Sequence, residues 1–160
     1  MFRAIVTNVK KAKKLDQAAL EECLQCACLS FRAASRVVTQ LFDEYLVPVG
    51  LLSTQLPVLL LLCLNESLAV SRLANLLVMD RTTLTKNLKP LRARGLVKVI
   101  SGPDKRKTLL AITPEGQALM ARAYPYWRQA QARIVEGLGP AQWDVVRGKL
   151  SEVVKVAGNR

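Results

Sequence analysis

Apolar residues recur at helical spacing over much of the chain, and the first clear run begins at Asp16. Its apolar positions stay within a narrow arc when successive residues are placed about 100° apart. The stripe consists of Leu20, Leu24, Ala27, Phe31, Val38, Phe42 and Tyr45. We expect one helix of roughly 30 residues that ends before Pro48 and Gly50. A helix of this length usually packs beside another helix, so the pattern favours a dimer interface.

The next apolar run, LPVLLLLCL at residues 56–64, predicts a buried helix. Ser53 can cap this helix, and Pro57 is tolerated because it lies in or next to the first turn. The helix should end near Asn65. The run is too short to span a membrane, which takes about 20 apolar residues.

Two helices are expected after this run, a short one at about residues 71–78 and another over 81–94. Asp80 is a suitable N-cap for the second helix, and Gly95 closes it. Pro90 lies inside this helix and removes one backbone hydrogen bond. We therefore expect either a bend before Pro90 or a loose last turn.

The stretches LVKVIS (96–101) and TLLAIT (108–113) predict two β-strands joined by the hexapeptide GPDKRK. Two short helices and a two-stranded hairpin, with helices on either side, are the element order of a winged helix-turn-helix. The expected fold class is mainly α with a small β-hairpin wing. In that order, 71–78 is the positioning helix and 81–94 is the recognition helix.

The C-terminal part predicts two more helices. Thr113 and Pro114 supply an N-cap and a first-turn proline for a helix that runs to about Gly137 and should be kinked at Pro125. One face of this helix is apolar and carries Leu119, Ala123, Tyr126, Ala130 and Ile134. The last helix begins at Gly139-Pro140 and runs to about Val156.

The charge is large and unevenly placed. The net charge of +12 favours a polyanion as partner, most often nucleic acid. Residues 68–110 carry +8 and residues 1–14 carry +5, whereas residues 15–50 carry −3. We therefore expect a basic arm at 1–14, a helical dimerisation part formed by 15–50 and 114–160, and a DNA-binding part at 51–113.

The recognition helix has two chemically distinct sides. Leu84, Leu88 and Leu91 occupy one side, and the other carries threonines and lysines at 82, 85, 86 and 89. Such a helix can hold to a core while hydroxyls and cations enter a major groove. An ordinary solvated helix face is the alternative, but the adjacent short helix, the basic hairpin and the local charge favour DNA binding.

The hairpin tip has its own chemistry. Gly102-Pro103 makes the turn, and Asp104 can pair with Arg106 and hold its guanidinium in one direction. A planar cation on a narrow loop suits a minor groove, where A·T tracts concentrate negative potential. The simpler interpretation is a hairpin tip whose charges only favour solubility.

These features together resemble the MarR family of bacterial transcription regulators. The resemblance covers about residues 45–121 and is carried by DRTTLT at the start of the recognition helix, RGLV, the wing D-x-R and the following ITPEGQAL. It implies a homodimer that binds a pseudo-palindromic operator, usually as a repressor. The wing here reads DKRK, which fits the family pattern, whereas Pro90 within the recognition helix is unusual.

The resemblance also implies a set of DNA contacts. Ser71 would touch the DNA backbone, and Arg106 would enter the minor groove, steadied by Asp104. The full set of expected DNA-binding residues is Ser71, Arg81, Thr82, Thr83, Thr85, Lys86, Lys89, Asp104, Lys105, Arg106 and Lys107.

Members of the family commonly release DNA when a small molecule, often an aromatic acid, binds between the dimerisation and DNA-binding parts. A polar strip along the first helix includes arginines that could take a carboxylate, with aromatic residues as apolar walls. The candidate pocket consists of Phe31, Arg32, Ser35, Arg36, Tyr45 and Trp127. The alternative is that Arg32 and Arg36 are solvated or pair with acids of a partner chain.

Oxidant sensing is the other regulatory possibility. The four cysteines are Cys23, Cys26, Cys28 and Cys63. Cys23 lies on the first helix, where peroxide-sensing relatives keep their reactive thiol. A C-x-x-C in mid-helix lacks the helix N-terminus that lowers a thiol pKa, so small buried cysteines at a packing face are the simpler explanation. A zinc site is disfavoured because the chain has no His.

Other classes of protein fit the sequence less well. An enzyme is not expected, because the chain has no His, carboxylate pair or phosphate-cradling Gly loop, and we expect no cofactor. A membrane-surface protein would explain the basic arm but not the helix and hairpin pattern. A winged helix used only for protein contacts would show apolar residues on the outward helix face. With no export signal, the cytoplasm is the default location.

Overall fold

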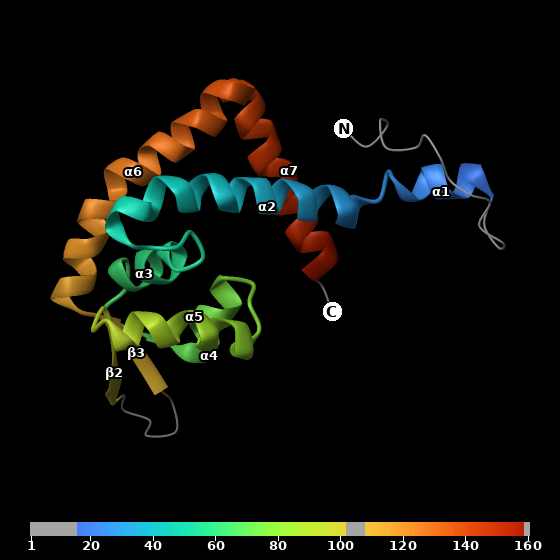
Figure 1. Cartoon of the computed structure of the whole chain (residues 1–160). Helices are drawn as coiled ribbons and strands as arrows, with labels where there is room; N and C mark the ends of the chain where they lie inside the picture. The colour runs from blue at the N-terminus through green and yellow to red at the C-terminus, as the bar shows by residue number, and fades with distance from the viewer. Residues whose placement is uncertain (1–15, 102–107, 159–160) are drawn as a thin grey trace. The chain divides into compact units, whose positions relative to one another are not determined.

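The computed structural model describes residues 16–101 and 108–158 and divides the chain into two compact units, 1–40 and 41–160. The fold is mainly helical with one small antiparallel sheet, as expected from the sequence (Figure 1).

The first unit contains α1 (Gln17–Cys23) and most of α2 (Ala27–Leu46). The prediction of one continuous helix from Asp16 is therefore wrong at residues 24–26. There the backbone N–H groups of Leu24, Gln25 and Cys26 donate to carbonyls three residues back instead of four. No residue of α1 is buried, so tertiary packing does not hold the two segments in one helix.

A short 3₁₀ turn, η2 (Val47–Val49), follows α2 and ends at Gly50, whose φ of 60° is left-handed. The next helix, α3 (Leu56–Cys63), contains Pro57 in its first turn as predicted. The predicted cap at Ser53 is wrong, because Gln55 holds the N-cap position and its side chain accepts from the Leu52 N–H. The Ser53 N–H instead donates to Asp43 Oδ1 at 2.6 Å.

The helix-turn-helix consists of α4 (Val70–Leu76) and α5 (Arg81–Ala93). Asp80 caps α5 as predicted, since its Oδ1 accepts from the Thr83 N–H at 2.8 Å. The helix stays continuous through Pro90. Gly95, at a φ of 69°, closes α5, also as predicted.

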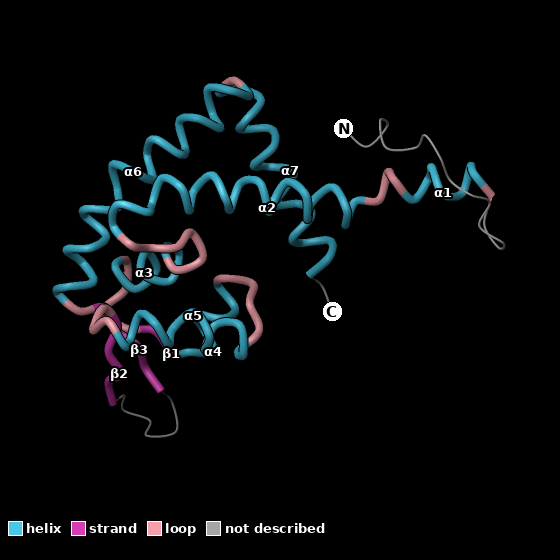
Figure 2. Tube along the Cα trace, viewed as in Figure 1, coloured by secondary structure: helices cyan, strands magenta, loops and turns pink. Residues whose placement is uncertain are grey.

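The sheet has one strand more than the sequence predicted. The hairpin strands are β2 (Val97–Ser101) and β3 (Thr108–Ile112), as expected, and a two-residue strand β1 (Leu68–Ala69) pairs with the other edge of β3. The strand order is β1-β3-β2, with all pairs antiparallel (Figure 2). The strand β1 therefore joins the start of α4 to the hairpin.

The C-terminal helices are α6 (Pro114–Leu138) and α7 (Pro140–Gly158). The Thr113 hydroxyl caps α6 by accepting from the Gly116 N–H, and it also donates to the Gly95 carbonyl at 2.7 Å. The start of α6 is thereby tied to the segment that closes α5. The helix α6 is continuous across Pro125, and the expected kink there stays a prediction.

The core of the second unit is built mainly from leucines. Val58, Leu59 and Leu62 of α3 are fully buried, as expected for the apolar run. They join buried residues from the helix-turn-helix, the sheet and the start of α6, which are Leu73, Leu84, Leu88, Leu91, Leu96, Leu110 and Leu119. This core fixes α5 against the hairpin and leaves the opposite side of α5 in solvent.

Candidate nucleic-acid interface

The helix α5 divides into a buried side and an exposed side, as its sequence predicted. Leu84, Leu88 and Leu91 are at most 5% exposed and anchor the helix in the core. The expected DNA-contacting residues of this helix, Arg81, Thr82, Thr83, Thr85, Lys86 and Lys89, are all exposed. Hydroxyls and cations are thus available along one face, the arrangement that a groove-binding helix needs.

The threonine hydroxyls of this face are not equivalent. Thr83 Oγ1 donates to Asp80 Oδ2 at 2.6 Å, and Thr85 Oγ1 donates to the Arg81 carbonyl at 2.7 Å. Both protons are committed inside the helix, so these side chains offer outward only a methyl group and oxygen lone pairs. Among the described residues, no side-chain hydrogen bond involves Thr82.

Asp80, the N-cap of α5, has a carboxyl group whose pKa is shifted. The hydrogen bond from the Thr83 hydroxyl, followed by the one from the Thr83 N–H, lowers the pKa of Asp80 from its ordinary value. Asp80 is therefore ionised at neutral pH and accepts two hydrogen bonds at the start of the helix. The cap fixes the first turn, which carries Arg81, Thr82 and Thr83.

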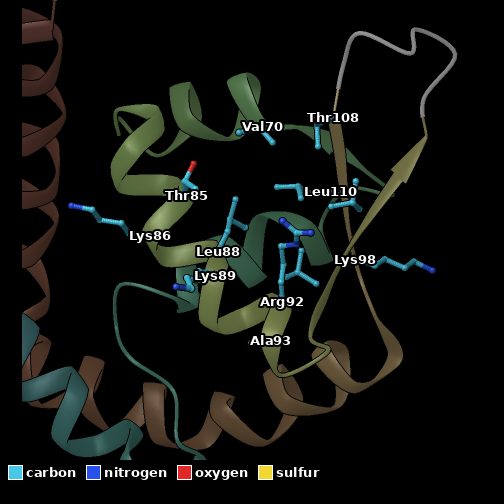
Figure 3. Close-up of a pocket in the computed structure, with 12 residues that line it drawn as sticks. Val70, Thr85, Lys86, Leu88, Lys89, Arg92, Ala93, Lys98, Thr108 and Leu110 are labelled. Carbon is cyan, nitrogen blue, oxygen red and sulfur yellow. The ribbon is translucent and has the colours of Figure 1, made fainter.

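A groove of about 700 Å³ separates α5 from the β2–β3 hairpin (Figure 3). Its apolar floor includes Leu88 of α5 and Leu110 of β3. Arg92 extends from α5 toward the hairpin, whereas Lys98 extends outward from β2. Arg92 is not among the DNA-binding residues expected from the sequence. Its spacing could have identified it, because Thr85, Leu88 and Arg92 share one helical stripe.

The remaining expected DNA contacts lie outside α5. Ser71 is exposed in the first turn of α4. The wing residues Asp104, Lys105, Arg106 and Lys107 lie outside the described residues. Their strands, β2 and β3, place the hairpin beside α5.

The expected ligand-pocket residues are divided between the two units. Phe31, Arg32, Ser35 and Arg36 belong to the first unit and are exposed. Tyr45 and Trp127 belong to the second unit and are half-buried. The ring of Trp127 stacks on Tyr124 with the centroids 6.0 Å apart. The pocket therefore stays a prediction.

All four cysteines are free and exposed, so the expectation that they are buried at a packing face is wrong for this chain. The break at residues 24–26 also changes their setting, since Cys26 directly precedes α2 and Cys28 lies in its first turn. A position in mid-helix therefore no longer argues against Cys26 or Cys28 as a reactive thiol. Partial burial raises the pKa of the Cys63 thiol, which makes it a poorer nucleophile at neutral pH.

Comparisons with known proteins identify the family. A sequence profile described as MarR family matches residues 49–107. The organic hydroperoxide resistance transcriptional regulator of Bacillus subtilis (strain 168) is 32% identical over 111 residues, which cover 69% of this chain and 74% of that protein. The chain belongs to the MarR family. The resemblance noted in the sequence is therefore confirmed.

Solved structures of MarR-family regulators share the fold. The M. tuberculosis transcriptional regulator MosR in complex with DNA is 36% identical, with a TM-score of 0.77 over 83% of this chain and 96% of that one. The transcriptional repressor CouR bound to a 23-mer DNA duplex is 28% identical, with a TM-score of 0.75 over 88% of this chain and 99% of that one. This MarR-family chain is thus a DNA-binding transcription regulator with a winged-helix fold.

No group of three or more His, Cys, Asp or Glu side chains is placed to hold a metal ion in residues 16–101 and 108–158. Over the same residues, no helix combines the length and the apolar character that crossing a membrane requires.

Proposed function

We propose that this MarR-family protein binds a specific operator as a homodimer and represses transcription. The observation that carries the proposal is the division of α5 into a buried leucine side and an exposed side with hydroxyls and cations. A helix held in this way can enter the major groove without exposing the core. Two copies related by a two-fold axis would read a pseudo-palindromic site, with one half-site for each α5.

Selection of duplexes from a randomised pool tests this proposal. The protein should enrich a sequence with two inverted half-sites whose centres lie about one helical turn apart or a multiple of it. Affinity for that sequence should fall steeply with salt. Removal of the Lys86 or Thr82 side chain by substitution with Ala should reduce the preference for the selected duplex. Enrichment of a sequence without inverted symmetry would contradict the homodimer.

Thr85 offers a sharper test of base reading. Because its hydroxyl proton is committed to the Arg81 carbonyl, Thr85 offers outward a methyl group and acceptor lone pairs but no donor. We propose that the methyl group makes the contact, because it suits the C5-methyl of thymine. Thr85→Val keeps a methyl group and should retain the preference, whereas Thr85→Ser should lose about 1 kcal/mol or more at one base position. Loss of the preference in Thr85→Val but not in Thr85→Ser would show that the hydroxyl reads the base.

For the wing, we propose that Arg106 enters the minor groove with Asp104 holding its guanidinium, flanked by Lys105 and Lys107. Support comes from the sequence and from the hairpin beside α5. Arg106→Ala should reduce affinity for the selected duplex substantially and leave the oligomeric state unchanged. Equal affinity of the variant and the parent protein would remove the wing from the proposal.

Release of DNA by a small aromatic acid is the first candidate for regulation. Arg32 and Arg36 would hold the carboxylate, with Phe31, Tyr45 and Trp127 as apolar walls. A screen of aromatic carboxylates for loss of duplex binding tests this candidate. Arg36→Ala should raise the concentration needed for release without changing DNA affinity in the absence of the acid. The candidate fails if no carboxylate in the screen releases the duplex.

Release by an oxidant is the second candidate, and two observations favour it. One curated relative is a regulator of organic hydroperoxide resistance, and all four cysteines of this chain are exposed and free. A cysteine thiolate would attack the peroxide O–O bond, take one oxygen as sulfenic acid and release an alcohol. An organic hydroperoxide should then release the duplex from the parent protein but not from a cysteine-free variant. Release from both proteins would exclude a cysteine sensor.

A further inference from the structure

The groove between α5 and the β2–β3 hairpin contains a cation that the proposed base and wing contacts leave unused. Its floor is apolar and closed, since Leu88 and Leu110 are 5% and 1% exposed. Above this floor, the guanidinium of Arg92 extends from α5 toward the hairpin, as Figure 3 shows. The groove therefore has an apolar floor with a planar cation above it.

Within the described residues, nothing offsets the positive charge of this groove. Its lining includes Lys86, Lys89, Arg92 and Lys98 but no Asp or Glu. The two ion pairs found among the described residues are both on α7, at Arg147–Asp144 and Lys149–Glu152. An anion that enters the groove thus meets the guanidinium of Arg92 and no carboxylate from the lining residues.

The geometry of duplex DNA indicates which anion this is. The major and minor grooves are separated by one sugar–phosphate strand. If α5 lies in the major groove and the hairpin reaches the adjacent minor groove, that strand must cross the space between α5 and the hairpin. Arg92 lies about two turns along α5 from Thr85, on the stripe that faces this space.

We propose that the groove between α5 and the β2–β3 hairpin seats the DNA backbone, with Arg92 donating to a phosphate. The inference rests on the proposed docking of α5 in the major groove. A guanidinium suits this task because its planar fork can donate two parallel hydrogen bonds to phosphate oxygens. The contact carries no base information, so it raises affinity for all duplexes equally.

Salt dependence of duplex binding is the test, with two probes: the duplex selected by the parent protein and a duplex of unrelated sequence. Each phosphate contact contributes about 0.9 to the slope of log affinity against log salt concentration. Arg92→Ala should therefore lower the slope by roughly 2 on the selected duplex, where two copies bind. The ratio of affinities for the two duplexes should not change, and Arg92→Lys should retain most of the slope.

Lys98→Ala is the matched control, because Lys98 lies beside the same groove but its side chain extends away from it. Lys98→Ala and Arg92→Ala each remove one positive charge. An effect of net charge alone would therefore change the salt slope of both variants equally. An unchanged slope for Arg92→Ala, an equal loss for Lys98→Ala, or a collapse of the affinity ratio would each overturn the proposal. A parent protein without sequence preference would instead contradict the proposed docking. The salt slopes of the parent protein and the variants can still be measured on the unrelated duplex, so the two failures are distinguishable.

Discussion

At the scale of single residues, two helix ends of this chain use the same hydrogen bonds with different residues. At the end of α5, the N–H groups of Gly95 and Leu96 donate to the Arg92 and Leu91 carbonyls. At the end of α4, Val78 and Met79 donate in the same way to Asn75 and Ala74. The pattern requires a left-handed residue, and Gly95 supplies it without strain at a φ of 69°.

Val78 occupies the equivalent position of α4 with a φ of 53°, although a β-branched residue is strained there. Because the Val78 side chain is 69% exposed, its removal costs little buried area. We expect Val78→Gly to raise the free energy of unfolding by about 1 kcal/mol. Urea unfolding measures the change.

Val78→Ala separates strain from side-chain loss, since it removes most of the side chain but keeps a Cβ. It should stabilise the protein less than Val78→Gly does. A decrease in stability for Val78→Gly would show that the left-handed turn is not strained.

The sequence predicted the end of α5 from Gly95, but no glycine signals the end of α4 at Leu76.

At the scale of elements, local chemistry predicted the starts of α5 and α6 but neither the break before α2 nor the short strand β1. The caps at Asp80 and Thr113 involve partners three residues away, so the sequence alone identified them. The strand β1 depends on pairing of Leu68 with Leu110, which lies far away in the chain. The break before α2 was missed because hydrophobic spacing continues across it while burial does not.

The cap of α5 predicts a pH dependence of stability. The hydrogen bond from the Thr83 hydroxyl lowers the pKa of Asp80 in the folded chain. The ionised carboxylate therefore stabilises the fold above the pKa of an unfolded Asp, about 3.9, and this contribution is lost as pH falls through the lower folded-state value. Asp80→Asn should thus lower the melting temperature at neutral pH.

The difference in melting temperature between the parent protein and Asp80→Asn should shrink as the pH falls below roughly 4. Thermal melts followed by circular dichroism from neutral to acid pH measure it. Asp144→Asn is a control, because Asp144 pairs on the exposed surface of α7 and caps nothing in α5. A difference that stayed constant over the whole range would show that the charge on Asp80 does not contribute.

The joint between α6 and the start of β2 depends on one glycine. A Cβ at Gly116 would lie 2.3 Å from the Leu96 carbonyl oxygen and 2.6 Å from Ile112 Cγ1. We expect Gly116→Ala to lower the free energy of unfolding by about 1–3 kcal/mol, because a backbone atom must move to admit the methyl group. Urea unfolding provides the measurement.

Gly137→Ala is the matched control on the same helix, since a Cβ there meets nothing within 4 Å. It should leave stability unchanged or raise it by up to about 1 kcal/mol, because Ala favours a helix over Gly. If both substitutions had the same effect, helix propensity alone would explain them and the close approach of α6 to Leu96 would be excluded.

At the scale of the whole molecule, the sequence predicts which part of the chain meets DNA and which part meets a second chain. Charge predicted the first, because the excess of cations lies at residues 68–110 and the exposed face of α5 belongs to it. Amphipathic spacing predicted the second, but periodicity cannot place one helix against another. Regulation was the least predictable feature, since the residues named for the ligand pocket are divided between the two units of the chain.

The proposed homodimer predicts that α7 is covered by a second copy. None of its residues is buried in the single chain, although Val146, Leu150 and Val153 form an apolar stripe at helical spacing. Leu150→Asp places a charge in this stripe and should shift the protein to a monomer with much weaker binding to a two-half-site duplex. Val156→Asp is the control, because Val156 is 82% exposed and lies off the stripe. Sedimentation equilibrium distinguishes the outcomes: an intact dimer for Leu150→Asp, or equal dissociation of both variants, would mean that this stripe does not form the interface.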